Sequence, residues 1–167
     1  AFFQVNTRQA ERLVSLALEH VREVSPRVVI DAYAGVGTFA AQLAAEVEHV
    51  VTIEESAGAG VDALENLGAF TNVTRVVGKV EETLPGMTPA PDVVIIDPPR
   101  AGIWASVVQA ILDSTATRVV YVSCDPGTLA RDLRLFVDGG FAIGSIQPVD
   151  MFPHTQHIEC VTVLDRA

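Results

Sequence analysis

The sequence predicts an α/β fold with a mostly parallel sheet covered by helices on both faces. Segments with helical periodicity alternate with short apolar runs along nearly the whole chain. These runs are continuous rather than alternating, which is typical of strands buried on both faces of a parallel sheet. With 167 residues, 49% of them hydrophobic, residues 1–167 are expected to form a single domain with a large core.

The expected helices carry apolar residues at helical spacing, and the expected strands are the apolar runs between them. The helices cover residues 7–24, 38–46, 59–68, 103–112 and 126–137. The strands cover residues 27–33, 50–53, 73–77, 93–96, 118–122, 141–149 and 158–164, with a loop at 85–91. Pro126 opens the last helix and Gly139 follows its end. Because no helix separates the last two strands, we expect them to pair antiparallel.

Charge and chain boundaries limit the function classes. The net charge is −10, and Lys79 is the single lysine among eleven basic residues. A nucleic-acid-binding surface needs positive charge, so either the substrate is not a polyanion or another part of the protein supplies that surface. The chain starts without a leader or linker, and we expect a fragment of a longer protein. No run is long enough for a membrane span and no signal peptide is visible, so the expected location is cytoplasmic.

The two cysteines, Cys124 and Cys160, are far apart, and no Cys-x-x-Cys spacing occurs. We therefore expect no zinc site, no iron–sulfur cluster and no disulfide framework within this chain. Cys160 lies inside an apolar run and is expected to be a small buried hydrophobe.

A glycine-rich turn, with Gly35 and Gly37, follows the first expected strand and opens a helix. Glu54 ends the second strand and Asp97 ends the fourth, so all lie at the edge where parallel sheets bind ligands. A carboxylate at the position of Glu54 can accept both hydroxyl protons of a ribose. Gly35-x-Gly37-x-x-Ala40 also fits a dinucleotide-binding fingerprint. A tight turn that binds no ligand is the alternative interpretation.

A nucleophile and a base are the second feature of the expected site. Cys124 ends the fifth strand just before a helix, whose field favours a thiolate, although the charge of Asp125 opposes it. Glu159 opens the last strand and is either a base or a solvated strand-end acid. His154 and His157 are expected to be structural. A thiol and a carboxylate at strand ends are what covalent catalysis on a weakly reactive ring requires.

Several segments together resemble the 5-methyluridine RNA methyltransferase family, over nearly the whole chain and in the family's order. They are residues 2–6, 31–39, Glu54, 97–102, 122–132 and 150–159. The resemblance implies a Rossmann-like class I methyltransferase fold with a seven-stranded, mostly parallel sheet and an antiparallel last strand. It also implies an enzyme with S-adenosyl-L-methionine as cofactor and RNA, either tRNA or rRNA, as substrate.

The resemblance also implies individual roles. Cys124 corresponds to the nucleophile, which adds to C6 of a uridine and activates C5 for methylation. Glu159 corresponds to the base that removes the C5 proton so that the cysteine can leave. The cofactor-binding residues, with the two glycines taken from the turn, are Gln4, Tyr33, Gly35, Gly37, Thr38, Glu54 and Asp97.

Two departures and several alternatives remain at this point. Ala34 replaces a frequent cysteine, and Lys79 replaces an acidic or amide residue near the adenine, which leaves cofactor affinity open. The small RNA-recognition domains that usually precede this fold are absent.

The alternatives are a cofactor-binding module without activity, a methyltransferase acting on adenine N6 or cytosine C5, and a nicotinamide-dependent oxidoreductase. A methyltransferase acting on adenine N6 would carry an aromatic residue in place of Arg100. An oxidoreductase would leave Cys124 and Glu159 without roles.

Overall fold

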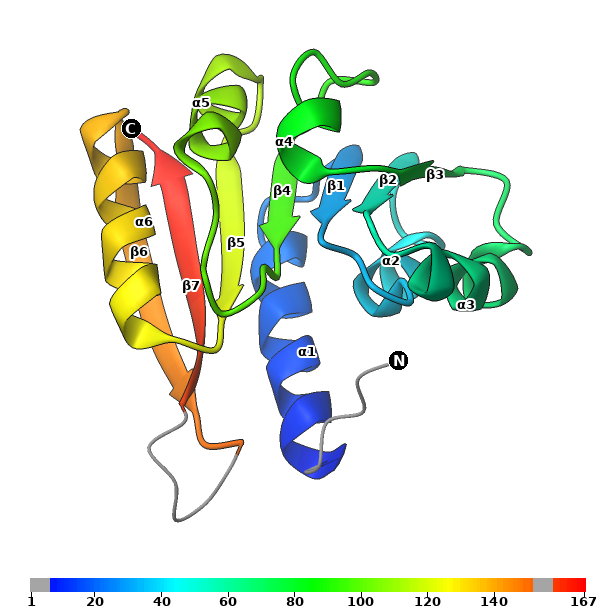
Figure 1. Cartoon of the computed structure of the whole chain (residues 1–167), viewed down its shortest axis with the longest axis horizontal. Helices are drawn as coiled ribbons and strands as arrows, with labels where there is room; N and C mark the ends of the chain where they lie inside the picture. The colour runs from blue at the N-terminus through cyan, green and yellow to red at the C-terminus, as the bar shows by residue number, and fades with distance from the viewer. Residues whose placement is uncertain (1–6, 152–157) are drawn as a thin grey trace.

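The computed structural model describes residues 7–151 and 158–167, and these form one seven-stranded sheet flanked by helices (Figure 1). The strands are β1 (Val28–Ala32), β2 (His49–Glu54), β3 (Val73–Val77), β4 (Val93–Ile96), β5 (Arg118–Ser123), β6 (Phe141–Val149) and β7 (Glu159–Arg166). The helices are α1 (Thr7–Arg22), α2 (Thr38–Leu43), α3 (Ala57–Leu67), α4 (Val80–Thr83), α5 (Ala105–Asp113) and α6 (Pro126–Asp138).

The sheet has the order β3-β2-β1-β4-β5-β7-β6. The first five strands are parallel, and β7 runs antiparallel between β5 and β6. The predicted α/β fold and the antiparallel pairing of the last two strands are therefore confirmed. The chain order reverses between β1 and β4, which is where open parallel sheets bind ligands at the carboxyl ends of their strands.

Helices cover both faces of the sheet (Figure 1). One core layer joins alternate strand residues to α1, α2 and α3, and the other joins the remaining strand residues to α4, α5 and α6. All four residues of β4 are buried, whereas the edge strand β3 is largely exposed. The continuous apolar runs of the inner strands thus have partners on both sides, as the sequence predicted.

The structure corrects a few predicted boundaries. Helix α1 ends at Arg22, because Ser25 has a positive φ of 46° and precedes a proline, which disfavours helical backbone there. The short helix α4 was not predicted, since four residues cannot display a helical period. Strand β7 continues to Arg166, which pairs with Phe141 of β6 and donates its backbone N–H to Thr117 O at 2.8 Å.

Two helix starts that position the site have local caps. The Asp125 side chain accepts a hydrogen bond from the Thr128 N–H at 2.9 Å and caps α6, with Pro126 at the first helical position. Ser56 caps α3 in the same way through the Ala59 N–H. Within residues 7–151 and 158–167, no helix is both long and apolar enough to cross a membrane.

Candidate active site

The described residues of the predicted site gather at one edge of the sheet. Tyr33 and Asp97 follow the carboxyl ends of β1 and β4, and Glu54 ends β2. Cys124 follows β5, whereas Glu159 begins β7, which runs in the opposite direction and so starts at the same edge. Gln4 lies outside the described residues. The sheet thus brings together side chains that lie more than a hundred residues apart in the sequence.

The strand register places the thiol and the last acid side by side. Ser123 of β5 pairs with Cys160 of β7, and Cys124 and Glu159 are the next residues outward on the two strands. The charge of Glu159 reaches the thiol, since it contributes to a rise in the pKa of Cys124. Glu159 is only 7% exposed, so its interpretation as a solvated strand-end acid is wrong.

The glycine turn is fastened to β2 by a carboxylate. Glu54 accepts hydrogen bonds from the backbone N–H groups of Gly35 at 2.8 Å and Ser56 at 2.7 Å. Gly35 and Gly37 have φ values of 56° and 82°, and Tyr33 also has a positive φ, 61°. A Cβ on Gly37 would lie 2.7 Å from Leu67 Cδ1, so this position needs glycine for both conformation and space. The carboxylate oxygens of Glu54 keep further lone pairs for a ligand hydroxyl.

Asp31, at the carboxyl half of β1, is a buried acid to which the sequence analysis gave no role. It is fully buried, and its Oδ2 accepts the Ala40 N–H at 3.3 Å, whereas Oδ1 has no hydrogen-bond partner among the described residues. Burial, followed by repulsion from Asp97, raises the pKa of Asp31 to about 8. The sequence did contain a signal for Asp31, because it is an acid within an apolar strand just before the glycine turn.

Asp97 is a second acid with a raised pKa at this edge. The surrounding protein atoms, followed by the charge of Glu159, raise its pKa to about 7. Its surface nevertheless remains exposed to solvent, and solvent access limits this rise. With these pKa values Asp31 is largely protonated and Asp97 partly protonated near neutral pH, and a ligand with positive charge at the β1–β2–β4 part of the edge would favour the ionised form of both acids.

The environment of Cys124 contains opposing charges. Loss of hydration raises the thiol pKa most, and the negative charges of Glu159 and Asp97 add to that rise. Arg100 acts in the opposite direction, because its guanidinium lies close enough for its positive charge and its hydrogen-bonding capacity to favour the thiolate. Burial also raises the pKa of Glu159 to about 6, and Arg100 partly offsets this effect. A carboxylate with that pKa is mostly ionised at neutral pH and can accept a proton.

The remaining predicted residues have simpler surroundings. Cys160 is buried in the core, as expected for a small hydrophobe, and burial raises its pKa. Thr38 is exposed at the first turn of α2, directly after the glycine turn. Lys79 follows β3 at the same edge of the sheet, and its Nζ lies 3.9 Å from Glu82 Oε1. Its amine therefore has an acidic neighbour on α4.

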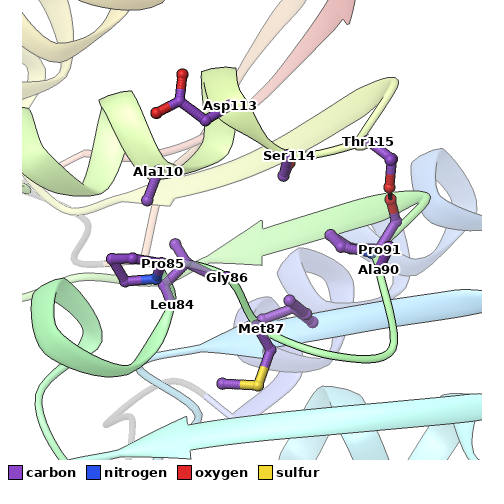
Figure 2. Close-up of a pocket in the computed structure, with 11 residues that line it drawn as sticks. Leu84, Pro85, Gly86, Met87, Ala90, Pro91, Ala110, Asp113, Ser114 and Thr115 are labelled. Carbon is purple, nitrogen blue, oxygen red and sulfur yellow. Dashed lines mark hydrogen bonds between the residues drawn. The ribbon is translucent and has the colours of Figure 1, made fainter.

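A pocket lies elsewhere, at the amino ends of β4 and β5 (Figure 2). It has a volume of about 260 Å³ and lies between the α4–β4 loop and the end of α5. Its lining is mostly apolar, and Thr115 Oγ1 donates a hydrogen bond to Pro91 O at 2.7 Å across its rim. None of the predicted site residues lines it, so cavity size does not locate the chemistry in this molecule. Among the described residues, no cluster of His, Cys, Asp and Glu side chains is arranged to hold a metal ion.

The strand order and the glycine turn define the Rossmann-like fold of class I methyltransferases. The fold alone is shared with the N-methyltransferase NodS from Bradyrhizobium japonicum, at a TM-score of 0.81 and 8% identity over 96% of this chain and 98% of that one. Much closer in sequence is the Pyrococcus abyssi tRNA (uracil-54, C5)-methyltransferase, solved in complex with S-adenosyl-L-homocysteine. It is 35% identical with a TM-score of 0.84, over 98% of this chain and 40% of that one.

Within the class, the chain is similar in sequence to RNA methyltransferases. Residues 88–167 match the family described as tRNA (Uracil-5-)-methyltransferase. An uncharacterised RNA methyltransferase from Halalkalibacterium halodurans is 44% identical over 99% of this chain. The resemblance to the 5-methyluridine RNA methyltransferase family is therefore confirmed. The chain spans 37% of the length of the Halalkalibacterium relative.

Proposed function

We propose that this chain is the catalytic domain of an enzyme that transfers a methyl group from S-adenosyl-L-methionine to C5 of a uridine in RNA. The observation that carries the proposal is the convergence of Cys124 and Glu159, from β5 and β7, at the sheet edge that also carries the glycine turn. A nucleophile and a base at one sheet edge suit a reaction in which a ring is first activated covalently and later released. The matching tRNA (Uracil-5-)-methyltransferase family and the similar Pyrococcus abyssi enzyme support the same reaction class.

The acids of the β1–β2–β4 edge fit the cofactor. S-adenosyl-L-methionine carries a sulfonium and an ammonium group, and its sulfonium methyl is the group it supplies to the reaction. Asp31 has a buried oxygen without a hydrogen-bond partner in the part of the chain that the structure describes, and Asp97 lies nearby, directly after β4. Glu54 is placed to accept the ribose hydroxyls. Tyr33, Gly35, Gly37 and Thr38 form the adjoining turn, and Gln4 completes the proposed set.

The chemistry proposed for the chain's own residues runs in three steps. The Cys124 thiol loses its proton to solvent, helped by the charge of Arg100, and the sulfur forms a bond to C6 of the uracil. The electron pair displaced onto C5 would then form the new carbon–methyl bond, while the bond between that methyl and the sulfonium sulfur breaks and leaves a neutral thioether. Glu159 removes the remaining C5 proton, and the C5–C6 double bond reforms as the bond from sulfur to C6 breaks.

The surface charge bears on how RNA is bound. A chain with a net charge of −10 lacks the excess of positive charge that an RNA-binding surface needs. We infer that domains outside this chain supply RNA recognition for a tRNA or rRNA target, and that the enzyme acts in the cytoplasm. The uridine must leave its stack to reach the sheet edge, as enzymes acting on bases generally require.

The alternatives from the sequence are weaker at this site. A cytosine-C5 mechanism would need a second cysteine at the edge, and Cys160 is packed in the core. An adenine enzyme would need an aromatic side chain where Arg100 contacts the thiol. A module that binds the cofactor without methylating RNA is the alternative that the raised pKa of Cys124 favours, since a protonated thiol is a poor nucleophile.

A mechanism-based substrate separates these functions. RNA containing 5-fluorouridine has no C5 proton to remove, so the enzyme should stall as a covalent complex. We expect the full-length parent with S-adenosyl-L-methionine to give an adduct that survives denaturing electrophoresis and maps to Cys124. Cofactor binding without any adduct on target RNAs that contain 5-fluorouridine would contradict the proposal and favour the binding module. The same assay on residues 1–167 alone tests whether RNA capture needs the missing domains.

A further inference from the structure

One face of α6 is tied to the loop that carries Arg100. This loop, residues 97–104, connects β4 to α5. Thr128, Arg131 and Asp132 lie at positions i, i+3 and i+4 of α6, so their side chains share one face of the helix. All three form hydrogen bonds with the loop, and we call this set the α6 clasp.

The clasp bonds the loop at successive residues. Thr128 Oγ1 donates to Arg100 O at 3.0 Å, and Arg131 Nη2 donates to Ala101 O at 2.9 Å. The Ile103 N–H donates to Asp132 Oδ2 at 3.0 Å. These three contacts, at Arg100, Ala101 and Ile103, fix the path of the loop backbone over four residues.

Asp132 is the anchor of the clasp. It is fully buried, and its Oδ2 also accepts the Tyr121 hydroxyl at 2.6 Å, which ties the clasp to β5. Its Oδ1 accepts hydrogen bonds from Arg131 Nε at 2.9 Å and Nη2 at 2.7 Å. A buried carboxylate needs such partners, and here every one of them belongs to β5, to α6 or to the loop. Gly102 fits closely against this pair, because a Cβ there would lie 2.4 Å from Asp132 Oδ2.

The same helix begins at the nucleophile. Cys124 directly precedes Asp125, the residue that caps α6. The helix therefore connects the thiol to the clasp, the clasp holds the loop, and the loop returns the Arg100 guanidinium to the sulfur. We infer that Thr128, Arg131 and Asp132 are positioning residues that hold Arg100 against Cys124. This inference deepens the proposed function, which it needs only for the role of the thiol.

The test measures Cys124 itself rather than methylation. Alkylation by iodoacetamide follows the thiolate, and mass spectrometry of the peptides separates Cys124 from Cys160. The groups facing the thiol are Glu159 from β7, Asp97 from β4 and Arg100 from the loop. Because Arg100 favours the thiolate, Arg100→Ala should move the alkylation midpoint to higher pH, by about half a unit to one unit.

Gly102→Ala is the central variant, since it removes no charge and no hydrogen-bonding side chain. The added Cβ meets Asp132 and Arg131, so the loop must move and the midpoint should rise as in Arg100→Ala. Gly86→Ala is the matched control, because Gly86 has a similar φ of 69° but open space around it. Its midpoint should stay at the wild-type value. Arg134→Ala, on an exposed α6 residue paired with Asp138, controls for loss of charge on the helix.

Combination with Arg100→Ala decides between positioning and general loosening. If the clasp acts through Arg100, Gly102→Ala should add no further shift in the Arg100→Ala background. In Asp132→Asn, the side-chain NH₂ group would face a donor, either the Arg131 guanidinium or the Ile103 N–H, and one bond of the clasp would be lost. The alkylation midpoint should therefore rise as it does in Gly102→Ala. Where Asp132→Asn does not fold, Arg131→Gln, at a half-exposed side chain, replaces it.

An unchanged midpoint in folded Gly102→Ala, or a shift that adds fully to that of Arg100→Ala, overturns the inference. A 5-fluorouridine RNA assay separates it from the proposed function. If the alkylation midpoints shift in the variants but the wild-type parent forms no RNA adduct, the positioning role of the clasp is supported and the methyltransferase function is contradicted. If the wild type forms adducts but the midpoints do not shift, the methyltransferase function is supported and the positioning role is contradicted.

Discussion

On the β1–β2 side of the sheet edge, one carboxylate holds the glycine turn through backbone amides, whereas on the β5–β7 side charged side chains act on the thiol of Cys124. Glu54 fastens the glycine turn through the N–H groups of Gly35 and Ser56. Across the edge, the thiol of Cys124 lies among Arg100, Glu159 and Asp97, so its protonation depends on their charges. Changes on the first side should therefore alter binding, and changes on the second side should alter chemistry.

Cys124→Ala should produce the largest effect and confine it to the β5–β7 side. Without the sulfur, C5 has no covalent activation, and methylation should fall by on the order of 10⁴-fold or more. Cofactor binding, measured by calorimetry, should remain within about twofold, since the β1–β2 side is unchanged. Cys160→Ala is the control, because it removes a buried thiol that packs in the core and should retain the RNA adduct. Substantial turnover by Cys124→Ala would remove the nucleophile from the mechanism.

Glu159→Gln should slow release rather than addition. The amide cannot take the C5 proton, so methylation turnover should fall about 10²–10⁴-fold while an enzyme–RNA adduct accumulates. In the wild type, release should also slow as the pH falls below about 6, because Glu159 becomes protonated there. The variant should lack this pH dependence. An adduct that never accumulates, with release still dependent on pH in that range, would assign the base elsewhere.

The two sides also differ in how far the sequence could predict them. The glycine turn and Glu54 are local features, in which conformation follows from residue type, and the sequence located them correctly at one edge. The burial of Glu159 and the contact of Arg100 with Cys124 depend on β7 entering between β5 and β6, which no local pattern specifies. Asp31 went unassigned for a related reason, since only the folded sheet shows that one of its oxygens has no hydrogen-bond partner within residues 7–151 and 158–167.

Asp31→Asn tests the electrostatics of the β1–β2 side. In the folded chain the pKa of Asp31 is raised to about 8 from an ordinary value near 3.8. Between these pH values the unfolded chain loses a proton that the folded chain retains, so this group makes the folded state less stable as the pH rises. The contribution is at most about 1.4 kcal/mol per pH unit. Asp97 and Glu54 face the same group, and their negative charges contribute to the raised pKa of Asp31.

Urea unfolding of wild type and Asp31→Asn between pH 5 and pH 8 measures this slope. The free energy of unfolding of the wild type should fall relative to that of the variant as the pH rises. A difference between the two that stays constant with pH would mean that Asp31 is ionised in the folded chain. The alkylation midpoint of Cys124 should remain unchanged in the variant, because Asp31 is absent from the charges that act on the thiol.

Gly37→Ala should give the smallest effect and also separate the two sides. A left-handed alanine costs about 1–2 kcal/mol, and its Cβ would lie 2.7 Å from Leu67 Cδ1, in a side chain that is itself buried. We expect a lower free energy of unfolding and weaker cofactor binding, with the alkylation midpoint of Cys124 unchanged. Gly86→Ala has a similar positive φ but no close neighbour, so it should show the backbone cost alone and normal cofactor binding. If Gly37→Ala moves the alkylation midpoint as far as Arg100→Ala does, the two sides form one coupled unit, and the distinction between binding and chemistry does not hold.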